Sequence, residues 1–335
     1  MIQHQYIERS SGMAVNERLF GDRMVGLLYS RVREQNSYLF SILTSRRASD
    51  LLAGVNFDIP LRNGRRFAER NGIDLTGCLD PPESLTTARK IFERRIRYEE
   101  CRPMPEMVDA VVSPADARVV PGSFSSDSLL FLKEKFFCFE ELLGEHSEEW
   151  QYAFRGGDFM IFRLTPDKYH YNHTPVAGRV VDFYSIEGGY HSCNPSAVVS
   201  MVTPCSKNRR VVTVIDTDVE EGTGAGLVAM VEVVALMIGD IVQAYSDEGY
   251  EAPRSMEKGM FLRKGQPKSL FRPGSSTDIL IFQPGRIRIA EDLAANACRA
   301  DVSSRFSHGF GKNVVETDVR VRSMVATALP KGDAR

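Results

Sequence analysis

Residues 271–285 read Phe271-Arg272-Pro273-Gly274-Ser275-Ser276-Thr277-Asp278-Ile279-Leu280-Ile281-Phe282-Gln283-Pro284-Gly285. A polar turn over residues 274–277 leads into the apolar run 279–282, and a Pro-Gly pair ends that run. β-branched and aromatic residues bounded by turn residues are typical of a short strand. By itself, the stretch predicts a plain polar turn that enters a strand.

Similar short runs divided by Gly and Pro fill the chain after Pro105. They are Val111-Val112, Phe159-Met160-Ile161-Phe162, Val180-Val181-Asp182-Phe183 and Val211-Val212-Thr213-Val214-Ile215. Runs at such close intervals predict a largely antiparallel β domain. Residues 226–239 fit either a long strand pair or a buried helix, and their many valines favour strands.

The first hundred residues have a different texture. From about Asn16 to Glu99, apolar residues recur at spacings of three and four, as in Val25, Leu28 and Val32, and this spacing predicts helices. Residues 85–95 form a further amphipathic helix candidate. We therefore expect an α+β protein with a helical N-terminal region over residues 1–105 and a mainly antiparallel β domain over residues 106–335.

Composition limits the partners and the compartment. Lys plus Arg total 42 against 44 for Asp plus Glu, so a net charge of -2 gives no long-range attraction to nucleic acid or anionic lipid. Any membrane contact must therefore be local. The six cysteines lack CxxC spacing, which argues against a disulfide framework and a zinc cluster. With no signal-peptide core and no apolar stretch of about 20 residues, we expect a cytoplasmic protein or one peripheral at the inner membrane surface.

Three separated stretches carry the residues of chemical interest. The first, Ser113-Pro114-Ala115-Asp116-Ala117-Arg118-Val119, places Asp116 in a turn, and alone it reads as a surface turn. The second, Tyr169-His170-Tyr171-Asn172-His173-Thr174-Pro175-Val176-Ala177-Gly178, holds two of the six histidines. That pair fits a metal half-site or structural polar groups, but no HExxH or CxxC supplies further zinc ligands. The third is the turn at residues 274–277.

Together the three stretches resemble the signature set of the phosphatidylserine decarboxylases, in the same order and at similar spacing. That family has an SPxDG segment, a YHxxHxPxxG segment and a G-S-T or G-S-S self-cleavage turn before a final strand. Residues 133–144, Asn208-Arg209-Arg210-Val211 and Lys264-Gly265-Gln266 also match, and the resemblance covers about Thr86 to Ile289. Ala117 stands where the family usually has Gly, and Pro273 where Gly or an apolar residue is usual.

The resemblance implies a self-cleaving proenzyme that acts as a lyase of phospholipid biosynthesis. Decarboxylating an α-amino acid requires an electron sink conjugated to the substrate nitrogen. A serine-derived pyruvoyl group supplies it as a Schiff base, without metal or PLP. The family roles carry over as follows: Asp116 orients His173, His173 activates the serine hydroxyl, and His170 serves the decarboxylation cycle.

Two countings place the reactive serine differently. Counting forward from Gly265 gives Ser275, and counting back from Phe282 gives Ser276. We favour Ser275, because the preceding Gly274 gives the sharp, uncrowded turn that the attack needs. Cleavage between Gly274 and Ser275 would yield a β chain of residues 1–274 and an α chain of residues 275–335 that starts with the pyruvoyl group. The two cleaved chains would be each other's partners.

The sequence leaves several interpretations of the substrate-binding residues and of the substrate. Ser192 matches a family serine near the substrate's polar group, although it also suits the cap of a turn, and His191 beside it would make the pocket more polar. The product would be phosphatidylethanolamine and carbon dioxide if phosphatidylserine is the substrate. The Leu27-to-Leu52 region, with Arg31, Arg33, Arg46 and Arg47, would then lie on the membrane, or else pack on the β domain.

Two alternatives differ in function. One is decarboxylation of a free aromatic amino acid, and the other is a family-derived binding module that does not cleave itself. The joint presence of Asp116, His170, His173 and a serine pair argues against the binding module. The oligomeric state is open, with a homodimer as one option.

Overall fold

The computed structural model describes residues 2–132, 135–144, 147–201, 203–237, 240–273 and 276–330. At its centre is a ten-stranded sheet. Its strands are antiparallel except for the strand at residues 5–8, which runs parallel to the strand at residues 317–319. In spatial order its strands are β11 (Phe261–Leu262), β7 (Gly178–Ile186), β8 (Arg210–Asp216), β9 (Leu227–Val233), β13 (Ser276–Phe282), β5 (Asp158–Leu164), β4 (Ala117–Ser123), β15 (Thr317–Val319), β1 (Gln5–Glu8) and β2 (Met13–Asn16).

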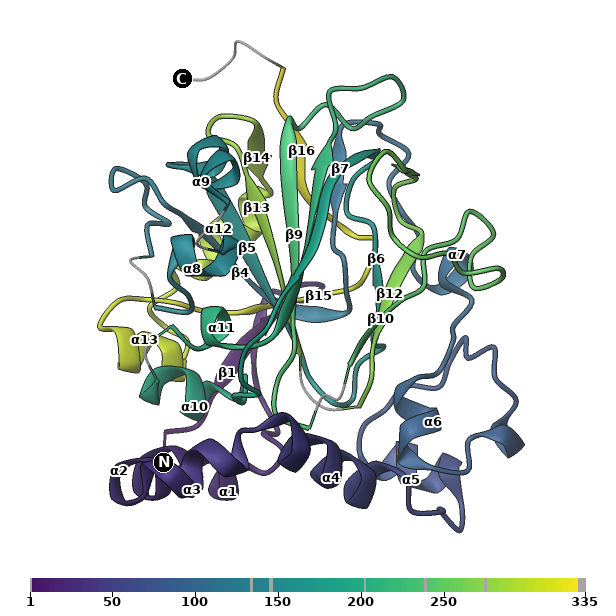
Figure 1. The fold of residues 1–335 in the computed structure, drawn as a ribbon, viewed down its shortest axis with the longest axis vertical. Helices are drawn as coiled ribbons and strands as arrows, with labels where there is room; N and C mark the ends of the chain where they lie inside the picture. The colour runs from purple at the N-terminus through teal and green to yellow at the C-terminus, as the bar shows by residue number, and fades with distance from the viewer. Residues whose placement is uncertain are drawn as a thin grey trace.

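Two three-stranded sheets accompany the large one (Figure 1). The first consists of β10 (Ile241–Gln243), β12 (Pro267–Phe271) and β6 (Tyr171–His173), and the second of β14 (Ile287–Ile289), β16 (Met324–Ala328) and β3 (Ala110–Val112). Every β-branched run singled out from the sequence lies in one of these strands, and the valine-rich stretch begins as β9, so the α+β, mainly antiparallel prediction is confirmed.

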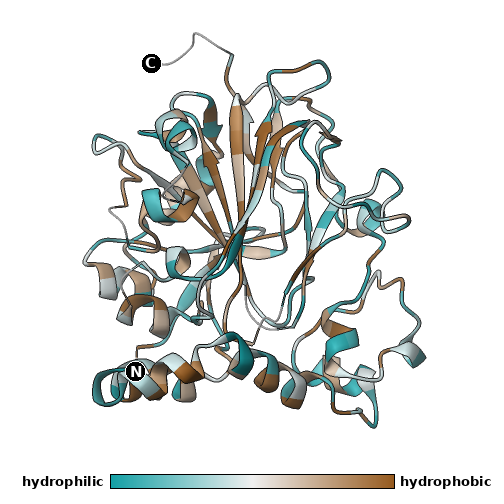
Figure 2. Cartoon of the chain, viewed as in Figure 1, coloured by the Kyte–Doolittle hydropathy of each residue, from teal (hydrophilic) through white to brown (hydrophobic). Residues whose placement is uncertain are grey.

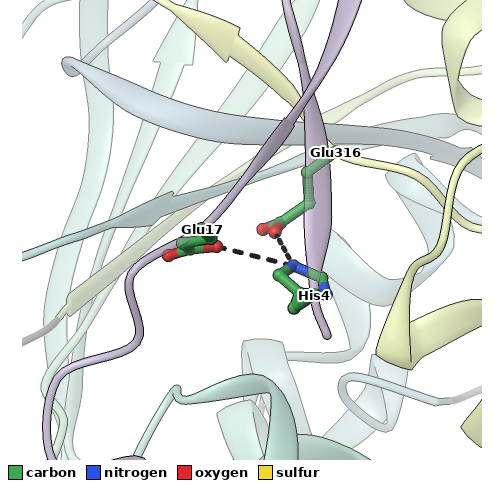
Figure 3. Close-up of side chains that lie close together, drawn as sticks. All are labelled: His4, Glu17 and Glu316. Atoms are coloured by element: carbon green, nitrogen blue, oxygen red, sulfur yellow. Dashed lines mark hydrogen bonds and ion pairs between the residues drawn. The ribbon is translucent and has the colours of Figure 1, made fainter. Parts of the chain in front are cut away.

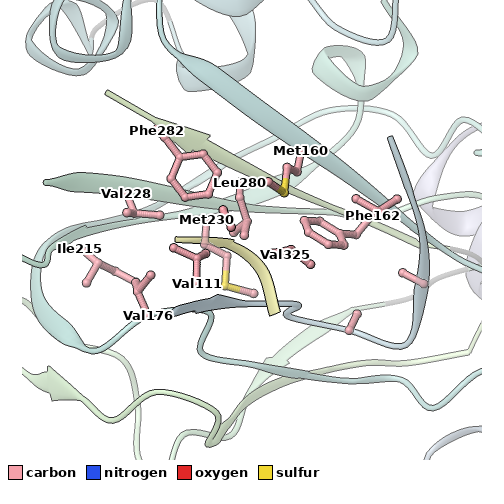
Figure 4. Close-up of a cluster of buried hydrophobic side chains, with 14 of the residues drawn as sticks. Val111, Met160, Phe162, Val176, Ile215, Val228, Met230, Leu280, Phe282 and Val325 are labelled. Carbon is pink, nitrogen blue, oxygen red and sulfur yellow. The ribbon is translucent and has the colours of Figure 1, made fainter. Parts of the chain in front are cut away.

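Strand β13 shows how the large sheet divides the core. Side chains alternate between the two faces of a strand. Leu280 and Phe282 therefore join the cluster between the large sheet and the small sheets (Figure 4), whereas Ile279 and Ile281 join a second cluster on the opposite face. All four side chains are fully buried. The predicted final strand is thus a central strand of the molecule.

Short helices cover the second face and contribute apolar side chains to its cluster. They are α8 (Phe139–Leu143), α9 (Glu148–Phe154), α10 (Pro195–Ser200), α11 (Pro204–Lys207) and α13 (Arg305–Phe310). A further helix, α12 (Glu291–Ala297), contacts β4 and β15. In the described part of the chain, no helix is long and apolar enough to cross a membrane.

The N-terminal region is helical after its first sixteen residues, which instead form the β1–β2 hairpin at the edge of the large sheet. Its helices lie in a row at the bottom of Figure 1 and continue to the right of that view. They are α1 (Asp22–Leu27), the π-helical turn η1 (Leu28–Val32), α2 (Arg33–Gln35), α3 (Ser37–Leu43), α4 (Arg46–Phe57), α5 (Gly64–Arg70), the 3-10 turn η2 (Pro82–Ser84), α6 (Ala88–Phe92) and α7 (Tyr98–Cys101).

The helix expected over residues 85–95 is shorter than its apolar pattern suggested. Thr87 caps α6 by accepting a hydrogen bond from the backbone N–H of Lys90 at 3.2 Å, and the helix ends at Phe92. Thr87 itself is extended and pairs with Pro60 in an isolated bridge. An N-cap residue has a non-helical backbone, which prevents the helix from beginning earlier.

Candidate active site

Asp116 lies in the turn between β3 and β4 and is bound by an arginine. Arg102 donates to both its carboxylate oxygens, with its shortest contact at 2.7 Å, and the backbone N–H of Val321 donates to Oδ1 at 2.8 Å. Burial raises the pKa of Asp116, but the hydrogen bonds and charge of Arg102 outweigh burial and hold that pKa below its ordinary value. Asp116 is therefore a carboxylate, and Ala117 after it has no positive φ that would demand glycine.

His173 ends β6 with both ring nitrogens engaged. Its Nδ1 donates to the carbonyl of Gly265 at 2.8 Å, and the hydroxyl of Tyr169 lies 2.9 Å from Nε2. Burial lowers the pKa of His173 to about 3, and the charge of Asp116 opposes this shift only weakly. The imidazole is neutral and oriented by a backbone carbonyl. The resemblance implied that Asp116 orients it, whereas the described contacts of Asp116 go to Arg102 and Val321.

His170 is held differently, with one nitrogen left over. Its Nδ1 donates to the carbonyl of Lys168 at 2.9 Å, and its ring stacks on that of Phe92 with centroids 3.5 Å apart. Burial, and next the charge of Arg94, keep the pKa of His170 well below its ordinary value. Within the described ranges Nε2 has no hydrogen-bond partner although it is buried. His170 is thus a neutral base with a free lone pair.

The structure places one of the three predicted cleavage residues. Ser276 is the first residue of β13 and pairs with Leu164 of β5. Its hydroxyl is buried, with no hydrogen-bond partner among the residues that the structure describes, and its carbonyl accepts from the thiol of Cys193 at 3.9 Å. Gly274 and Ser275 lie outside the described residues, as do Lys133 and Glu134 of the matched stretch 133–144.

The two histidines lie at different positions along the same strand pair. The backbone N–H of Phe271, the last residue of β12, donates to the carbonyl of His170 at 3.1 Å. His173 instead pairs with Pro267, the first residue of β12. Since the predicted cleavage turn follows the end of β12, the backbone of His170 borders the end of the strand that leads into that turn.

The predicted substrate residues lie under the N-terminal helices. The hydroxyl of Ser192 accepts a hydrogen bond from the backbone N–H of Asn194 at 3.2 Å, as the turn-cap interpretation predicts. The His191 ring stacks on Phe40 of α3 with centroids 5.7 Å apart, and burial lowers its pKa to about 4. Both residues are therefore covered by N-terminal helices that lie more than a hundred positions away from them in the sequence.

A large apolar cavity opens beside these residues. It has a volume of about 680 Å³ and is lined by the N-terminal helices on one side and by the β domain on the other. Ser192, Cys193 and Leu164 belong to its wall, and so does Phe92, which also stacks on His170. The cavity therefore reaches the residues that border Ser276 and is separated from His170 by one aromatic ring.

Glu17, which lines the cavity, belongs to a buried ion cluster. Figure 3 shows this residue with His4 and Glu316. His4 contacts Glu316 at 2.8 Å and Glu17 at 3.5 Å, a grouping that could in principle hold a metal ion. Arg163, however, donates to both carboxylates, at 2.6 Å in each case. A guanidinium already compensates the two acids, so we interpret the cluster as a structural ion network.

Sequence reasoning missed several residues of the site. Arg102 binds Asp116 across 14 positions. Phe92, the last residue of α6, stacks on His170, and the charge of Arg94, just beyond the end of that helix, acts on the same ring. A run such as Ile91-Phe92-Glu93-Arg94 shows only helical amphipathicity, so it gives no sign of which of its residues lie against His170. Tyr169 had a usable signal, because it lies directly beside His170 in the matched segment.

Comparison with known proteins identifies the family. The family model described as phosphatidylserine decarboxylase matches residues 88–306, and this chain belongs to that family of carboxy-lyases. A phosphatidylserine decarboxylase proenzyme of Nitrosococcus oceani is 31% identical over 274 residues, covering 79% of this chain and 85% of the relative. A proenzyme of that name from Chlamydia trachomatis is 29% identical, with 92% of this chain and 97% of the relative covered. One from Ruminiclostridium cellulolyticum is 27% identical, with 83% and 86% covered.

Proposed function

We propose that the chain cuts itself at residues 274–276, forms a pyruvoyl group there, and decarboxylates phosphatidylserine at a membrane surface. The relatives named above are phosphatidylserine decarboxylase proenzymes, and most of each is covered. The apolar cavity of about 680 Å³ beside the site is the observation that carries the choice of a lipid over a free amino acid. A cavity of this size has room for acyl chains as well as a headgroup, whereas a free amino acid would fill only part of it.

The residues around the turn fit a serine-derived pyruvoyl group. Buried hydroxyls normally have hydrogen-bond partners. The Ser276 hydroxyl has none among the residues that the structure describes, which is compatible with a reactive role. The pyruvoyl group supplies a ketone that accepts electrons when carbon dioxide leaves. This observation speaks for Ser276, while the Gly274 argument speaks for Ser275, and the fragment mass described in the Discussion separates the two.

The two histidines divide the proton transfers. His173 takes the serine proton during self-cleavage, with Asp116 contributing negative charge nearby and Gly265 fixing the ring. His170, whose unprotonated Nε2 has no hydrogen-bond partner in the described part of the chain, holds or moves the proton that ends on the substrate's α-carbon. Both imidazoles are kept neutral by burial, which is the protonation state that a general base requires.

The N-terminal helices provide the membrane contact in this proposal. Exposed large apolar side chains gather there, and Figure 2 shows hydrophobic segments among hydrophilic ones along these helices. The residues are Met24, Leu27, Tyr38, Leu39, Ile42, Leu51, Val55 and Ile59, all at least 41% exposed. Apolar side chains on short helices that carry arginines suit insertion into the headgroup region. The same helices line the cavity, so an acyl chain would pass from the bilayer into the protein.

The small fragment would remain bound after the cut. It would contribute β13 between β9 and β5, β15 between β4 and β1, and β16 between β14 and β3. Each of these strands lies between two strands of the large fragment, or between one of them and another strand of its own. Self-cleavage would therefore change the covalent chain without separating the two products.

The experiment compares substrates directly. Purified protein is incubated with carboxyl-labelled phosphatidylserine in vesicles, with free serine and with free tryptophan, and labelled carbon dioxide is collected from each. We expect release from the lipid and none above background from the free amino acids. Release from free amino acids alone would overturn the lipid assignment. An uncut chain that releases nothing would favour the binding-module interpretation.

A further inference from the structure

One carboxylate on the large sheet gathers all three strands of a small sheet. Glu232 of β9 accepts hydrogen bonds from Lys268 at 2.6 Å and from Ser269, both on β12. It also accepts from Asn172 of β6 at 3.3 Å and from Gln243 of β10 at 3.4 Å. Glu232, Lys268, Ser269 and Asn172 are all fully buried. None of these contacts serves the histidines or the cavity.

A second acid lies directly across the ladder from this carboxylate. Asp278 of β13 pairs with Glu232 of β9, so their side chains lie side by side on the same face of the sheet. Asp278 is fully buried, and in the described part of the chain neither of its oxygens has a hydrogen-bond partner. Burial, and next the charge of Glu232, raise the pKa of Asp278 well above its ordinary value. The ammonium of Lys268 thus contacts the Glu232 carboxylate, and Asp278 lies beside that pair with its pKa raised.

These residues flank the proposed cleavage turn on both sides in the sequence. Lys268 and Ser269 precede the cleavage turn on β12, and Asp278 follows it on β13. Glu232 accepts hydrogen bonds from the β12 residues before the turn and pairs with Asp278 of β13 after it. We propose that Glu232, Lys268 and Asp278 form a polar seam that positions β12 against β13, so that the turn between them is presented for self-cleavage and its two ends stay aligned afterwards. This inference rests on the proposed self-cleavage.

The physical reason is directional bonding in an otherwise apolar layer. The neighbouring residues on the same faces, such as Met230, Leu280 and Phe162, are core residues and would tolerate small shifts between the sheets. Hydrogen bonds and a buried ion pair fix distance and angle more narrowly than apolar packing does. A strand that enters a reactive turn needs such placement, because attack by a hydroxyl on a neighbouring carbonyl depends strongly on geometry.

The test compares self-cleavage with stability. Full-length proenzyme is expressed in the cold, purified uncut, and warmed to start cleavage, with the intact fraction followed on denaturing gels and Tm measured in parallel. Lys268→Met and Glu232→Gln should each slow cleavage by about tenfold or more at temperatures where circular dichroism shows a folded chain. Asp278→Val removes the polar group of the third seam residue and should also slow cleavage, by severalfold, whereas the conservative Asp278→Asn keeps a polar group there and should slow it less.

A matched control separates positioning from general destabilisation. Thr217→Val removes a buried hydroxyl that donates to the carbonyl of Gly226 at 2.7 Å. Gly226 precedes the first residue of β9, whereas Glu232 lies near the last, so this contact is remote from the seam. It should lower Tm and leave the cleavage rate of the folded protein unchanged. Folded Lys268→Met and Glu232→Gln proteins that cleave at the parent rate would overturn the seam alone. A parent chain that never cleaves would overturn the proposed function instead.

Discussion

Arg94 and His170 donate hydrogen bonds to the same acceptor, the carbonyl of Lys168, at 3.2 Å and 2.9 Å. Arg94 is 3% exposed, and its guanidinium donates to the backbone carbonyls of Ile91, Asp167 and Lys168. A buried cation beside an imidazole opposes protonation of that imidazole, so Arg94 helps to hold His170 neutral.

The first prediction concerns this charge. Arg94→Met should raise the pKa of His170 from its depressed value, so the acid limb of the kcat/KM profile should move to higher pH. The sign follows because the working form of His170 is neutral and a higher pKa protonates it earlier as pH falls. Arg94→Lys keeps a charge and should shift the limb less. Identical profiles for Arg94→Met and the parent would contradict this role.

The second prediction separates the two histidines. His173→Ala should leave the chain uncut, because the serine loses its base. His170→Ala should still cut itself but lose turnover by about 100-fold or more, the usual contribution of a general acid or base. Denaturing gels report the cut, and carbon dioxide release reports turnover. A His170→Ala chain that stays uncut would refute the division of roles.

The third prediction tests the membrane face. Leu51 and Val55 on α4 are 69% and 57% exposed, so Leu51→Asp with Val55→Asp should not disturb the fold. The pair should weaken sedimentation with phosphatidylserine vesicles and lower activity on them, because two charges enter the headgroup boundary. Activity on a short-chain, soluble phosphatidylserine should be kept. Leu129→Asp changes an 87% exposed leucine elsewhere and is the control.

The fourth prediction is a pH dependence of stability. The pKa of Asp278 is raised in the folded chain by burial and by Glu232, while Lys268 opposes the shift. The folded state therefore binds this proton more tightly than the unfolded state does. The resulting stabilisation is fully present below the ordinary pKa of 3.8 and is lost as pH rises toward the folded pKa. Asp278→Asn should remove this pH dependence. Between pH 4 and pH 7 the free energy of unfolding of the variant should therefore rise relative to that of the parent. Parallel curves would show that Asp278 is not the group responsible.

The strands could be predicted from the sequence because their signal is local. Val211-Val212-Thr213-Val214-Ile215 is β-branched, and it forms the buried strand β8 whatever its partners are. Asp116, His170 and His173 were found through their motifs. The motifs did not reveal that Gly265 orients His173, since that hydrogen bond joins residues 92 positions apart.

Other features depended on the tertiary structure. Glu232 sits in a valine-rich run and Lys268 in a mixed one, and only the meeting of two sheets makes them a pair. The β1–β2 hairpin was missed because four-residue strands carry too little pattern to stand out beside helices. The cavity was missed because its walls come from helices and strands distant in sequence.

The most direct measurement is the intact mass of the small fragment. The account predicts a fragment of about 60 residues that begins at position 275 or 276 and is lighter, by the mass of ammonia, than the same peptide beginning with serine. Ser275→Ala should block the cut if position 275 is reactive, and a fully cut Ser275→Ala chain would assign Ser276. A single uncut chain of 37.5 kDa, or a fragment that begins with an ordinary serine, would contradict the account.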